Sequence, residues 1–291
     1  MLSRSQGLPA VVCAPTLAER LRELYARRET IRFLTGSYLK AGHRDKVLGH
    51  LWSLLDPLLF MLVYFLVFGV LFGLAGGGGR SLRFMLYILI AVLTWRFFQG
   101  AISQSANCIR ANRGLIHEIS FPKAILPVTV VLSRLYDFAW GLVVVVAMLL
   151  AAGVWPTIHY LWLPLLVALT LVFVQGAAFI VAYLGAFFAD TTNVVDVALR
   201  LLFYTSPIFY YVRHKPGVPE HQVFLTEHAT LHFWYMLNPI TCLYECFRDA
   251  LLWGQAPELR LLGCAAAFAL LICLVGFAVF ASGEGKFAKY V

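Results

Sequence analysis

Long uninterrupted apolar segments are the feature that most constrains the fold of this chain. Six of them are long enough to cross about 30 Å of hydrocarbon as helices, near residues 51–74, 84–106, 125–152, 161–188, 194–212 and 259–281. Hydrophobic residues make up 61% of the 291 residues and charged residues only 13%, whereas a soluble domain is about half apolar. The sequence therefore predicts an all-α integral membrane protein with six transmembrane helices.

The distribution of basic residues predicts the orientation of these spans. The net charge is +8, which in a soluble protein would suggest a nucleic-acid partner, but here the position of each charge relative to the spans matters more. With the N-terminus in the cytoplasm, fifteen Lys and Arg residues fall in cytoplasmic segments and six in external ones. The positive-inside rule thus predicts cytoplasmic N- and C-termini, and no nucleic-acid partner is expected.

Two regions are expected: a cytoplasmic N-terminal segment at 1–50 and a membrane domain at 51–291. The first begins with a capping-box pattern at 16–19. Apolar residues then follow near helical spacing, with arginines mostly on the other side: Leu17, Leu21, Leu24, Tyr25 and Ile31. This pattern predicts an amphipathic helix lying in the membrane interface, with an ordinary solvated helix as the alternative.

The junction KVLGHLWSLLDPLL at 46–59 joins the basic segment to the first span. Asp is a favourable N-cap and Pro is favoured at the first helical position, so Asp56 and Pro57 can start a helix where the bilayer begins. Trp52 would lie at headgroup depth, where indole rings are enriched. These three residues are predicted to form a span-entry cap with a bend in front of the span.

Ionisable residues inside the spans are few, and such residues mark by default a functional site or an ion pair. Arg96 lies in the middle of ILIAVLTWRFFQG. We hypothesise that it faces a water-filled lumen and meets an anionic group there; the alternative is snorkelling or pairing with an acid on another helix. Arg134 and Asp137 are three residues apart, which makes them neighbours on a helix and favours a structural pair.

The segment at 213–258 is too apolar to be simply solvated, with aromatic runs such as HFWYMLNP. We expect it to contain one or two short helices that re-enter the outer leaflet or cap a pore between the fifth and sixth spans. Its histidines are irregularly spaced, at His214, His221, His228 and His232, so that no metal site is predicted.

Catalytic motifs are missing from the sequence. There is no G-x-x-x-x-G-K-[ST] loop for ATP phosphates, no H-E-x-x-H and no G-x-S-x-G. A membrane-bound transferase would need clustered acids or histidines, and Asp190 and Asp196 in ADTTNVVD lack such partners. The chain is therefore not expected to be an enzyme.

The stretch LGHLWSLLDPLL at 48–59 resembles the LGxLW-x-x-x-x-P signature of ABC-2 type permeases, the membrane subunits of bacterial polysaccharide exporters. The O-antigen, teichoic acid and capsule exporters belong to that family. Further segments resemble the family's motifs in the same order: WRFF at 95–98, GLIHEISFPKAILP at 114–127, YTSPIFY at 204–210 and LNPITCLYECFRDALLWGQAP at 237–257. The resemblance extends along most of the chain.

This resemblance implies a permease subunit of an ATP-driven exporter of lipid-linked polysaccharide in the bacterial cytoplasmic (inner) membrane. It implies a homodimer with two copies of a separate ATPase subunit, which would bind ATP and Mg, so that no cofactor is expected on this chain. The alternatives are an ABC-2 permease for a small amphipathic drug or lipid, and a membrane-bound glycan or acyl transferase.

The resemblance also implies a cytoplasmic coupling helix at about 114–122 that docks on the ATPase. Its residues are Leu115, Ile116, His117, Glu118, Ile119 and Phe121, with an apolar face formed by Leu115, Ile116, Ile119 and Phe121.

A path for sugars favours flat apolar rings with polar tips. The residues expected along it are Tyr64, Phe68 and Phe72 in the first span, Trp95, Arg96, Phe97 and Phe98 in the second, and Tyr204, Phe209 and Tyr210 at the end of the fifth. For the aromatic residues the alternative is an interfacial belt or helix packing.

Overall fold

The computed structural model describes residues 22–23, 25–43, 55, 58–59, 62–63, 66–67, 79–118, 121–215, 218, 223 and 229–287. Within these ranges every regular element is a helix, apart from an isolated bridge between Tyr211 and Val223. The predicted all-α class is confirmed for this part of the chain. The capping box at 16–19 and most of the predicted first span lie outside the described residues.

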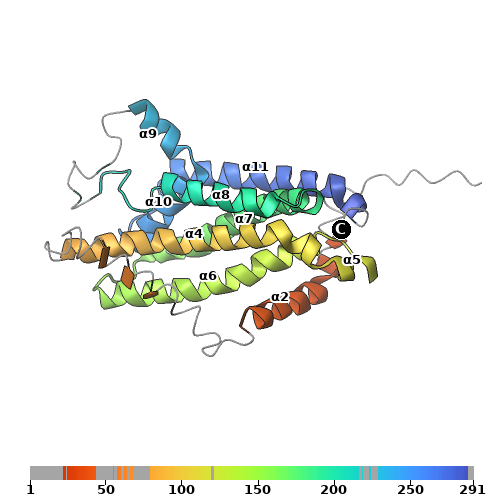
Figure 1. The fold of residues 1–291 in the computed structure, drawn as a ribbon. Coiled ribbons are helices and arrows are strands. Elements are labelled where there is room, and N and C mark those ends of the chain that lie inside the picture. Colours follow the sequence, from red (N-terminus) through yellow and green to blue (C-terminus); the bar gives the residue numbers. More distant parts are fainter. Residues whose placement is uncertain are drawn as a thin grey trace, which may run out of the picture.

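Four long helices match the second, third, fourth and sixth predicted spans. They are α4 (Gly79–Ala111), α6 (Ile125–Ala151), α7 (Leu163–Phe187), which continues the 3₁₀ helix η3 (Ile158–Trp162), and α11 (Leu259–Gly283), which is followed by the 3₁₀ helix η5 (Glu284–Lys286). Each is long and apolar enough to cross a membrane. They pack side by side in one bundle (Figure 1).

The predicted fifth span is shorter than expected. The helix α8 (Thr191–Thr205) has 15 residues, and at 1.5 Å per residue it is about 22 Å long, less than the hydrocarbon thickness. It ends at Thr205. The backbone of the next residue, Ser206, is extended (φ −85°, ψ 148°), because Pro207 disfavours a helical conformation in the residue before it. The prediction of a span to residue 212 was therefore wrong at its end.

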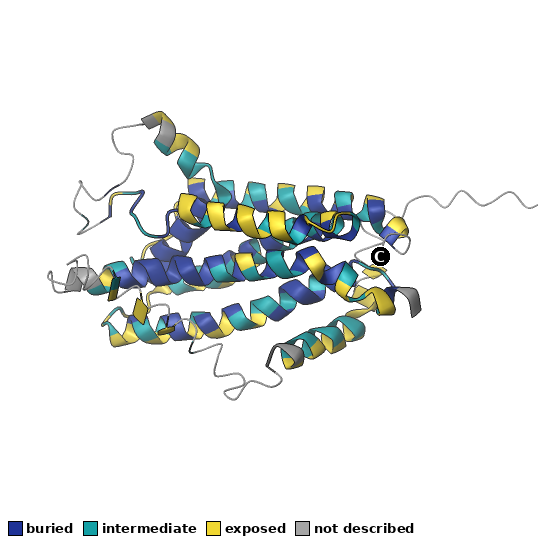
Figure 2. Ribbon diagram, viewed as in Figure 1, coloured by how far each residue is buried: buried dark blue, intermediate teal, exposed yellow. Residues whose placement is uncertain are grey.

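Helix α4 is the centre of the bundle. Its first half includes MLYILIAVL at 85–93, which is buried at every residue, as expected for a helix that is apolar all round. It packs against α6, α7, α8 and α10, whereas α11 exposes much of its surface (Figure 2).

Helices α7 and α11 approach each other closely through small residues. A Cβ atom added at Gly176 would lie 2.5 Å from the backbone of Cys273, and one added at Gly276 would collide with the backbone of Gly176. Glycine is required at this crossing because any side chain would push the two helices apart. This contact fixes the position of α11, whose end reaches the α5 end of the bundle.

Two short helices lie between α8 and α11, as predicted for the segment at 213–258. They are α9 (Ala229–Met236) and α10 (Pro239–Leu251). The side chain of Asn238 caps α10 by accepting a hydrogen bond from the Ile240 amide at 3.0 Å. Every residue from Ile240 to Leu251 is buried, because α10 is wedged among α4, α7, α11 and η3.

The main described element of the N-terminal region is the helix α2 (Arg28–His43), which lies along α6 (Figure 1). Its Ile31, Leu34 and Tyr38 pack against an apolar cluster at the α5 end of the bundle. The Tyr38 hydroxyl accepts a hydrogen bond from Asn112 at 2.7 Å. The outer side of α2 carries Arg28, Arg32 and Phe33 and is exposed. Of the predicted apolar face, Tyr25 is exposed and Ile31 half-buried, and Leu17, Leu21 and Leu24 lie outside the described residues.

Candidate functional site

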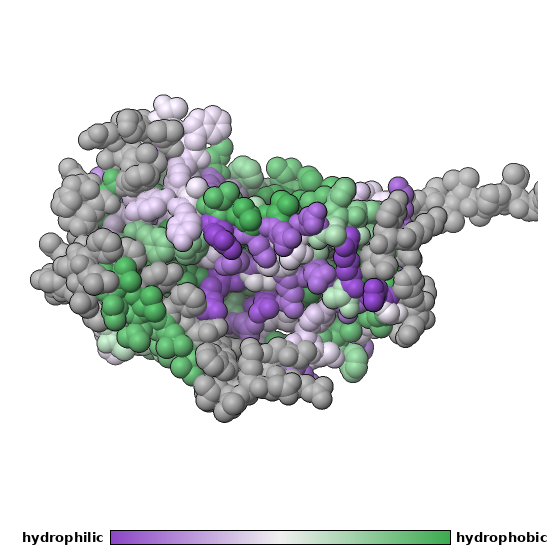
Figure 3. Space-filling model, in the orientation of Figure 1, coloured by the Kyte–Doolittle hydropathy of each residue, from purple (hydrophilic) through white to green (hydrophobic). Residues whose placement is uncertain are grey.

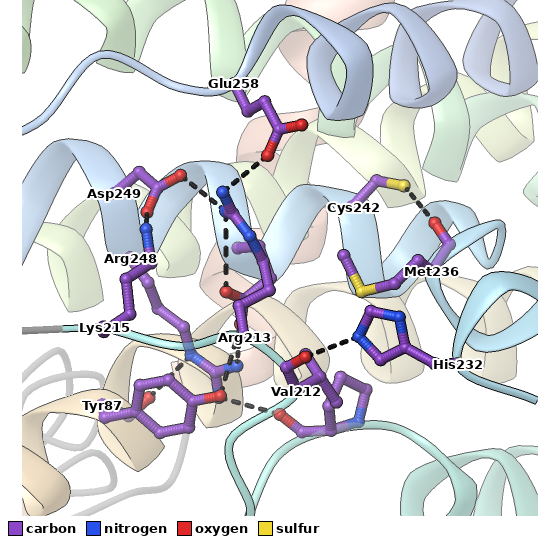
Figure 4. A network of polar contacts seen from close by, with 12 residues as sticks. Tyr87, Val212, Arg213, Lys215, His232, Met236, Cys242, Arg248, Asp249 and Glu258 are labelled. Carbon is purple, nitrogen blue, oxygen red and sulfur yellow. Dashed lines mark hydrogen bonds and ion pairs between the residues drawn. The ribbon is translucent and has the colours of Figure 1, made fainter. Parts of the chain in front are cut away.

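Three charged side chains of α10 are buried inside the bundle. Glu245 and Asp249 are 1% exposed and Arg248 is fully buried. Burying a charge is costly unless it is paired and hydrogen-bonded. Figure 4 shows the pairing: contacts run from α10 to α4 and to the chain that follows α8.

Arg248 contacts three separate parts of the chain. Its Nε donates to the carbonyl of Tyr87 at 3.2 Å, and its Nη2 donates to the carbonyls of Pro207 and Ile208 at 2.9 and 3.3 Å. Its Nη1 lies 2.9 Å from Oε1 of Glu245. The guanidinium carbon lies 3.3 Å from the centroid of the Tyr87 ring, a cation–π contact. One side chain thus joins α4, α10 and the end of α8.

Asp249 anchors the segment beyond α8. Its carboxylate accepts hydrogen bonds from Arg213, at 2.9 Å, and from Lys215. Arg213 also donates to Glu258 at 2.6 Å and lies 3.9 Å from Glu245. Burial alone would lower the pKa of Arg213, but Asp249 first, then Glu245 and Glu258, raise it above its ordinary value. Arg213 is therefore charged.

We call this set the buried network: Tyr87, Arg213, Lys215, Glu245, Arg248, Asp249 and Glu258. Its three cations balance its three carboxylates, and these groups bind one another (Figure 4). It fixes the positions of α4, α10 and the segment after α8 relative to one another. Arg248 is one of the six basic residues that the predicted topology assigns to external segments, and its burial was not predicted. The spacing of Glu245, Arg248 and Asp249 places them on one side of a helix, but it does not show that this side is buried.

A second polar feature runs along α4. Arg96, Gln99, Ser103, Asn107 and Arg110 recur every three or four residues, which places them on one side of the helix. All five are half-buried or exposed, although α4 is otherwise the most buried span. Figure 3 shows hydrophilic side chains gathered in a band over the face formed by α8, α4 and α6. The band covers the half of α4 that leads to α5.

Neighbouring helices add polar groups to this band. Ser103 donates to Asp196 of α8 at 2.7 Å, and Gln104 accepts from Nε of Arg134 on α6 at 2.9 Å. Arg134 also lies 3.5 Å from Asp137, which confirms the predicted pair. The hydrogen bonds fix α6 and α8 on either side of the polar side of α4.

We call the following residues the polar stripe: Arg96, Gln99, Ser103, Asn107 and Arg110 of α4, Arg134 and Asp137 of α6, and Asp196 and Arg200 of α8. It holds four arginines and two aspartates and is therefore positive overall. Arg200 follows Asp196 by one helical turn. Chemically, the stripe combines hydrogen-bonding groups for a hydroxyl-rich solute with positive charge for an anionic one.

The structure separates Arg96 from the aromatic residues around it. Trp95, Phe97 and Phe98 are buried, and each ring packs on a ring of α8, α6 or α7 with centroids 5.6, 5.1 and 5.6 Å apart. Arg96 lies half-buried on the polar stripe. Of the predicted path residues in WRFF, only Arg96 is on the stripe. The three aromatic rings lie on the other sides of α4, which pack against neighbouring helices.

The predicted exit residues differ in accessibility. Tyr204 is 69% exposed at the end of α8. Phe209 and Tyr210 are half-buried, and the Tyr210 hydroxyl hydrogen-bonds to that of Tyr235. Tyr204 is the one of these three that offers an open ring surface. The predicted path residues of the first span, Tyr64, Phe68 and Phe72, lie outside the described residues, as does the span-entry cap of Trp52, Asp56 and Pro57.

The predicted coupling helix corresponds to α5 (Arg113–Glu118), which is shorter than the expected 114–122. Ile116 and Phe121 are buried in the cluster at this end of the bundle, so these two residues of the predicted docking face serve the chain's own packing. Arg113 and Gly114 are exposed and Leu115 is half-buried. Ile119 and the side chains of His117 and Glu118 lie outside the described part.

Among the described residues, no group of three or more His, Cys, Asp and Glu side chains could hold a metal ion. His232 of α9 hydrogen-bonds through Nε2 to the carbonyl of Val212 at 2.8 Å. Burial raises the pKa of the Cys246 thiol in α10 to about 12. His232 and Cys246 thus have structural contacts at and near α10.

The sequence profile of the ABC-2 type transporter family matches residues 30–252 of the chain. That range includes α5, the polar stripe and most of the buried network.

Several curated proteins are similar over most of their length. An O-antigen export system permease protein RfbA from Myxococcus xanthus is 27% identical over 271 residues, which are 93% of this chain and 98% of that protein. An RfbA protein of the same description from Klebsiella pneumoniae is 23% identical, covering 88% of this chain and 92% of the relative. The polysialic acid transport protein KpsM from Escherichia coli is 24% identical, covering 81% and 86%.

Proposed function

The chain belongs to the ABC-2 type transporter family, and we propose that it is the membrane-spanning permease subunit of an ATP-driven exporter of lipid-linked polysaccharide. The observation that carries the proposal is the polar stripe. Charged and hydrogen-bonding groups at the depth of apolar spans are costly against lipid, and they are retained where they face a solute path. A permease needs such a surface, and a purely structural bundle does not.

The relatives favour polysaccharide over a drug or a lipid as the substrate. The family as a whole does not decide this, because both alternatives remain within it. The relatives quoted above carry names that refer to O-antigen export or polysialic acid transport, and they align over more than four-fifths of this chain. The chain is accordingly a transport subunit and not itself an enzyme.

The composition of the stripe suggests how a lipid-linked glycan would be handled. Sugar hydroxyls can exchange hydrogen bonds with Gln99, Ser103 and Asn107, which are side chains with both donors and acceptors. An anionic linkage such as a pyrophosphate would be drawn to the excess of arginine, with Arg96 at the middle of α4 and Arg110 at its end. Beyond the stripe, the exposed ring of Tyr204 offers a flat surface near the exit.

A second copy of the chain would complete this path. The stripe is one face of a bundle, and a sheltered lumen needs a surface opposite it. Beside the stripe, α8 exposes the apolar side chains of Val194, Val197 and Leu201, which suit contact with another helix. The proposed assembly is a homodimer in the bacterial cytoplasmic membrane, with both termini in the cytoplasm and two ATPase subunits at the α5 end.

The proposal can be tested by expressing the chain with its ATPase and reconstituting the purified complex into vesicles. A two-plus-two complex should move a fluorescent lipid-linked glycan in an ATP-dependent way. Arg96→Ala should lower this transport about tenfold or more, the loss expected for one or more charge-assisted hydrogen bonds. Arg83→Ala, at an exposed arginine near the other end of the same helix, is the matched control and should stay near wild type.

Two results would contradict the proposal. One is a chain that associates with no ATPase. The other is an Arg96→Ala complex that transports at the wild-type rate. ATP-independent glycan or acyl transfer by the purified chain would favour the transferase alternative instead.

A further inference from the structure

The junction between α5 and α6 is held by a residue from the far end of the sequence. The backbone N–H of Lys123 donates to Oε1 of Glu284 at 2.6 Å, although the two residues are 161 positions apart. Lys123 lies two residues before α6, and Ala124 at the N-cap provides no side-chain hydrogen bond. No local side chain caps α6, and Glu284 supplies from η5 an acceptor for the backbone N–H just before the helix.

Electrostatics favour this arrangement. The N-terminus of a helix carries a partial positive charge, and a carboxylate close to it is stabilising. The turn that leads into α6 is completed by hydrogen bonds from the amides of Ile125 and Leu126 to the carbonyls of Pro122 and Lys123, at 3.1 Å each. The carboxylate of Glu284 thus fixes the first residues of α6 in space, not only their local conformation.

The same end of α11 also supports α5. Phe280 and the fully buried Phe287 belong to one apolar cluster with Ile116 of α5 and Phe121 of the junction. The rings of Phe280 and Phe287 are 5.1 Å apart. A helix of six residues has little stability of its own, so its position depends on what it packs against. The end of α11 therefore meets α5 by packing and the α5–α6 junction by a hydrogen bond.

We propose that Glu284 is a positioning residue for the α5–α6 junction, and that through it the end of α11 sets the orientation of the exposed side of α5, at Arg113 and Gly114, toward the ATPase. The second half of this statement rests on the proposed function. The first half concerns the chain alone. A movement of α11 within the bundle would then shift the exposed side of α5 that faces the ATPase.

The first test is amide hydrogen exchange at Lys123 in the purified chain without ATPase. Because the chain has six lysines, selective ¹⁵N-lysine labelling gives few signals from which to follow this amide. Glu284→Ala should exchange about tenfold faster or more at Lys123, as expected when a charge-assisted hydrogen bond is lost. Glu284→Gln keeps an acceptor oxygen but loses the charge, so its exchange rate should fall between those of wild type and Glu284→Ala. Lys286→Ala, an exposed change in the same turn, is the control.

The second test uses the complex with the ATPase and measures glycan exported per ATP hydrolysed. Glu284→Ala should lower this ratio about fivefold while basal hydrolysis and assembly are kept, because the orientation of the exposed side of α5 changes and its composition does not. Glu284→Gln should restore the ratio. If the alanine variant unfolds, Glu284→Asp, which draws the carboxylate back from Lys123, should give an intermediate loss.

An unchanged exchange rate at Lys123 in Glu284→Ala would overturn the proposal. Faster exchange with an unchanged transport ratio would overturn its second half. A wild-type chain that exports no glycan would instead defeat the proposed function, while the exchange experiment would still decide whether Glu284 holds the junction.

Discussion

Replacing Arg248 by methionine should destabilise the chain strongly. The change removes four hydrogen bonds, to Glu245 and to the carbonyls of Tyr87, Pro207 and Ile208, together with the contact on the Tyr87 ring. Glu245 is 1% exposed, and its remaining cation lies 3.9 Å away. Breaking a buried pair by removing one partner costs about 3–5 kcal/mol, and we expect a loss in that range.

Unfolding of the purified chain in mixed micelles, followed over a denaturing-detergent titration, would measure this loss. Arg260→Met is the matched control: Arg260 is exposed at the start of α11, and its replacement should change stability by less than about 0.5 kcal/mol. Arg248→Lys keeps the charge but lacks the planar fork, so it should lose about 1–3 kcal/mol.

Adding Glu245→Gln tests whether the loss comes from a stranded buried charge. Glutamine removes the charge that Arg248→Met leaves uncompensated, so the double variant should be more stable than Arg248→Met alone. An Arg248→Met protein as stable as the Arg260→Met control would refute the reasoning that the buried network holds α4, α10 and the end of α8 together.

Three other outcomes follow from the packing. Gly176→Leu should unfold the chain or lower its free energy of unfolding by more than about 3 kcal/mol, since its Cβ would lie 2.5 Å from the backbone of Cys273. Gly263→Ala is the control: it has open space around it and should be neutral or slightly stabilising in the same titration. Asn238→Ala should cost about 1 kcal/mol by removing the cap of α10, and a wild-type midpoint would contradict that role. The pKa of the Cys246 thiol is raised from 9.0 to about 12 in the folded chain. Its contribution to the free energy of unfolding is therefore fully present below pH 9 and is lost as the pH rises through 12, because the unfolded chain loses this proton first. In Cys246→Ala the stability curve should be flatter over that window, by up to about 4 kcal/mol.

The sequence allowed the spans of α4, α6, α7 and α11 to be predicted because their signal is local: length and apolar content are visible without knowing the fold. The end of α8 was also readable, since Pro207 stops a helix at the preceding residue. Apolar residues after it led to a prediction that was too long. Hydrophobicity alone does not say whether a residue lies in a helix.

The buried network could not be predicted in the same way. Glu245, Arg248 and Asp249 lie on a short amphipathic helix, a pattern that usually faces water. Their burial depends on Arg213 and Lys215, which are more than thirty residues away in sequence and come close only when the segment after α8 folds back onto α10. Pairing over that separation leaves no local pattern.

The polar stripe and α5 lie between these cases. The spacing of Gln99, Ser103 and Asn107 was visible in the sequence, but on α4 only Arg96 was recognised, because charge was given more weight than periodicity. In α5 the apolar pattern was recognised, but its partner was not. Ile116 packs inside the chain, and a pattern cannot tell an intramolecular partner from another subunit.

Photo-crosslinking to a radiolabelled lipid-linked glycan during ATP-driven transport tests the central claim most directly. A photoreactive residue at Gln99, exposed on the polar stripe, should capture the glycan only with ATP. The same residue at Val143, which is 58% exposed on the apolar surface of α6, should capture lipid and no glycan. Equal capture at both positions, or capture at Val143 alone, would contradict the claim that the polar stripe lines the export path.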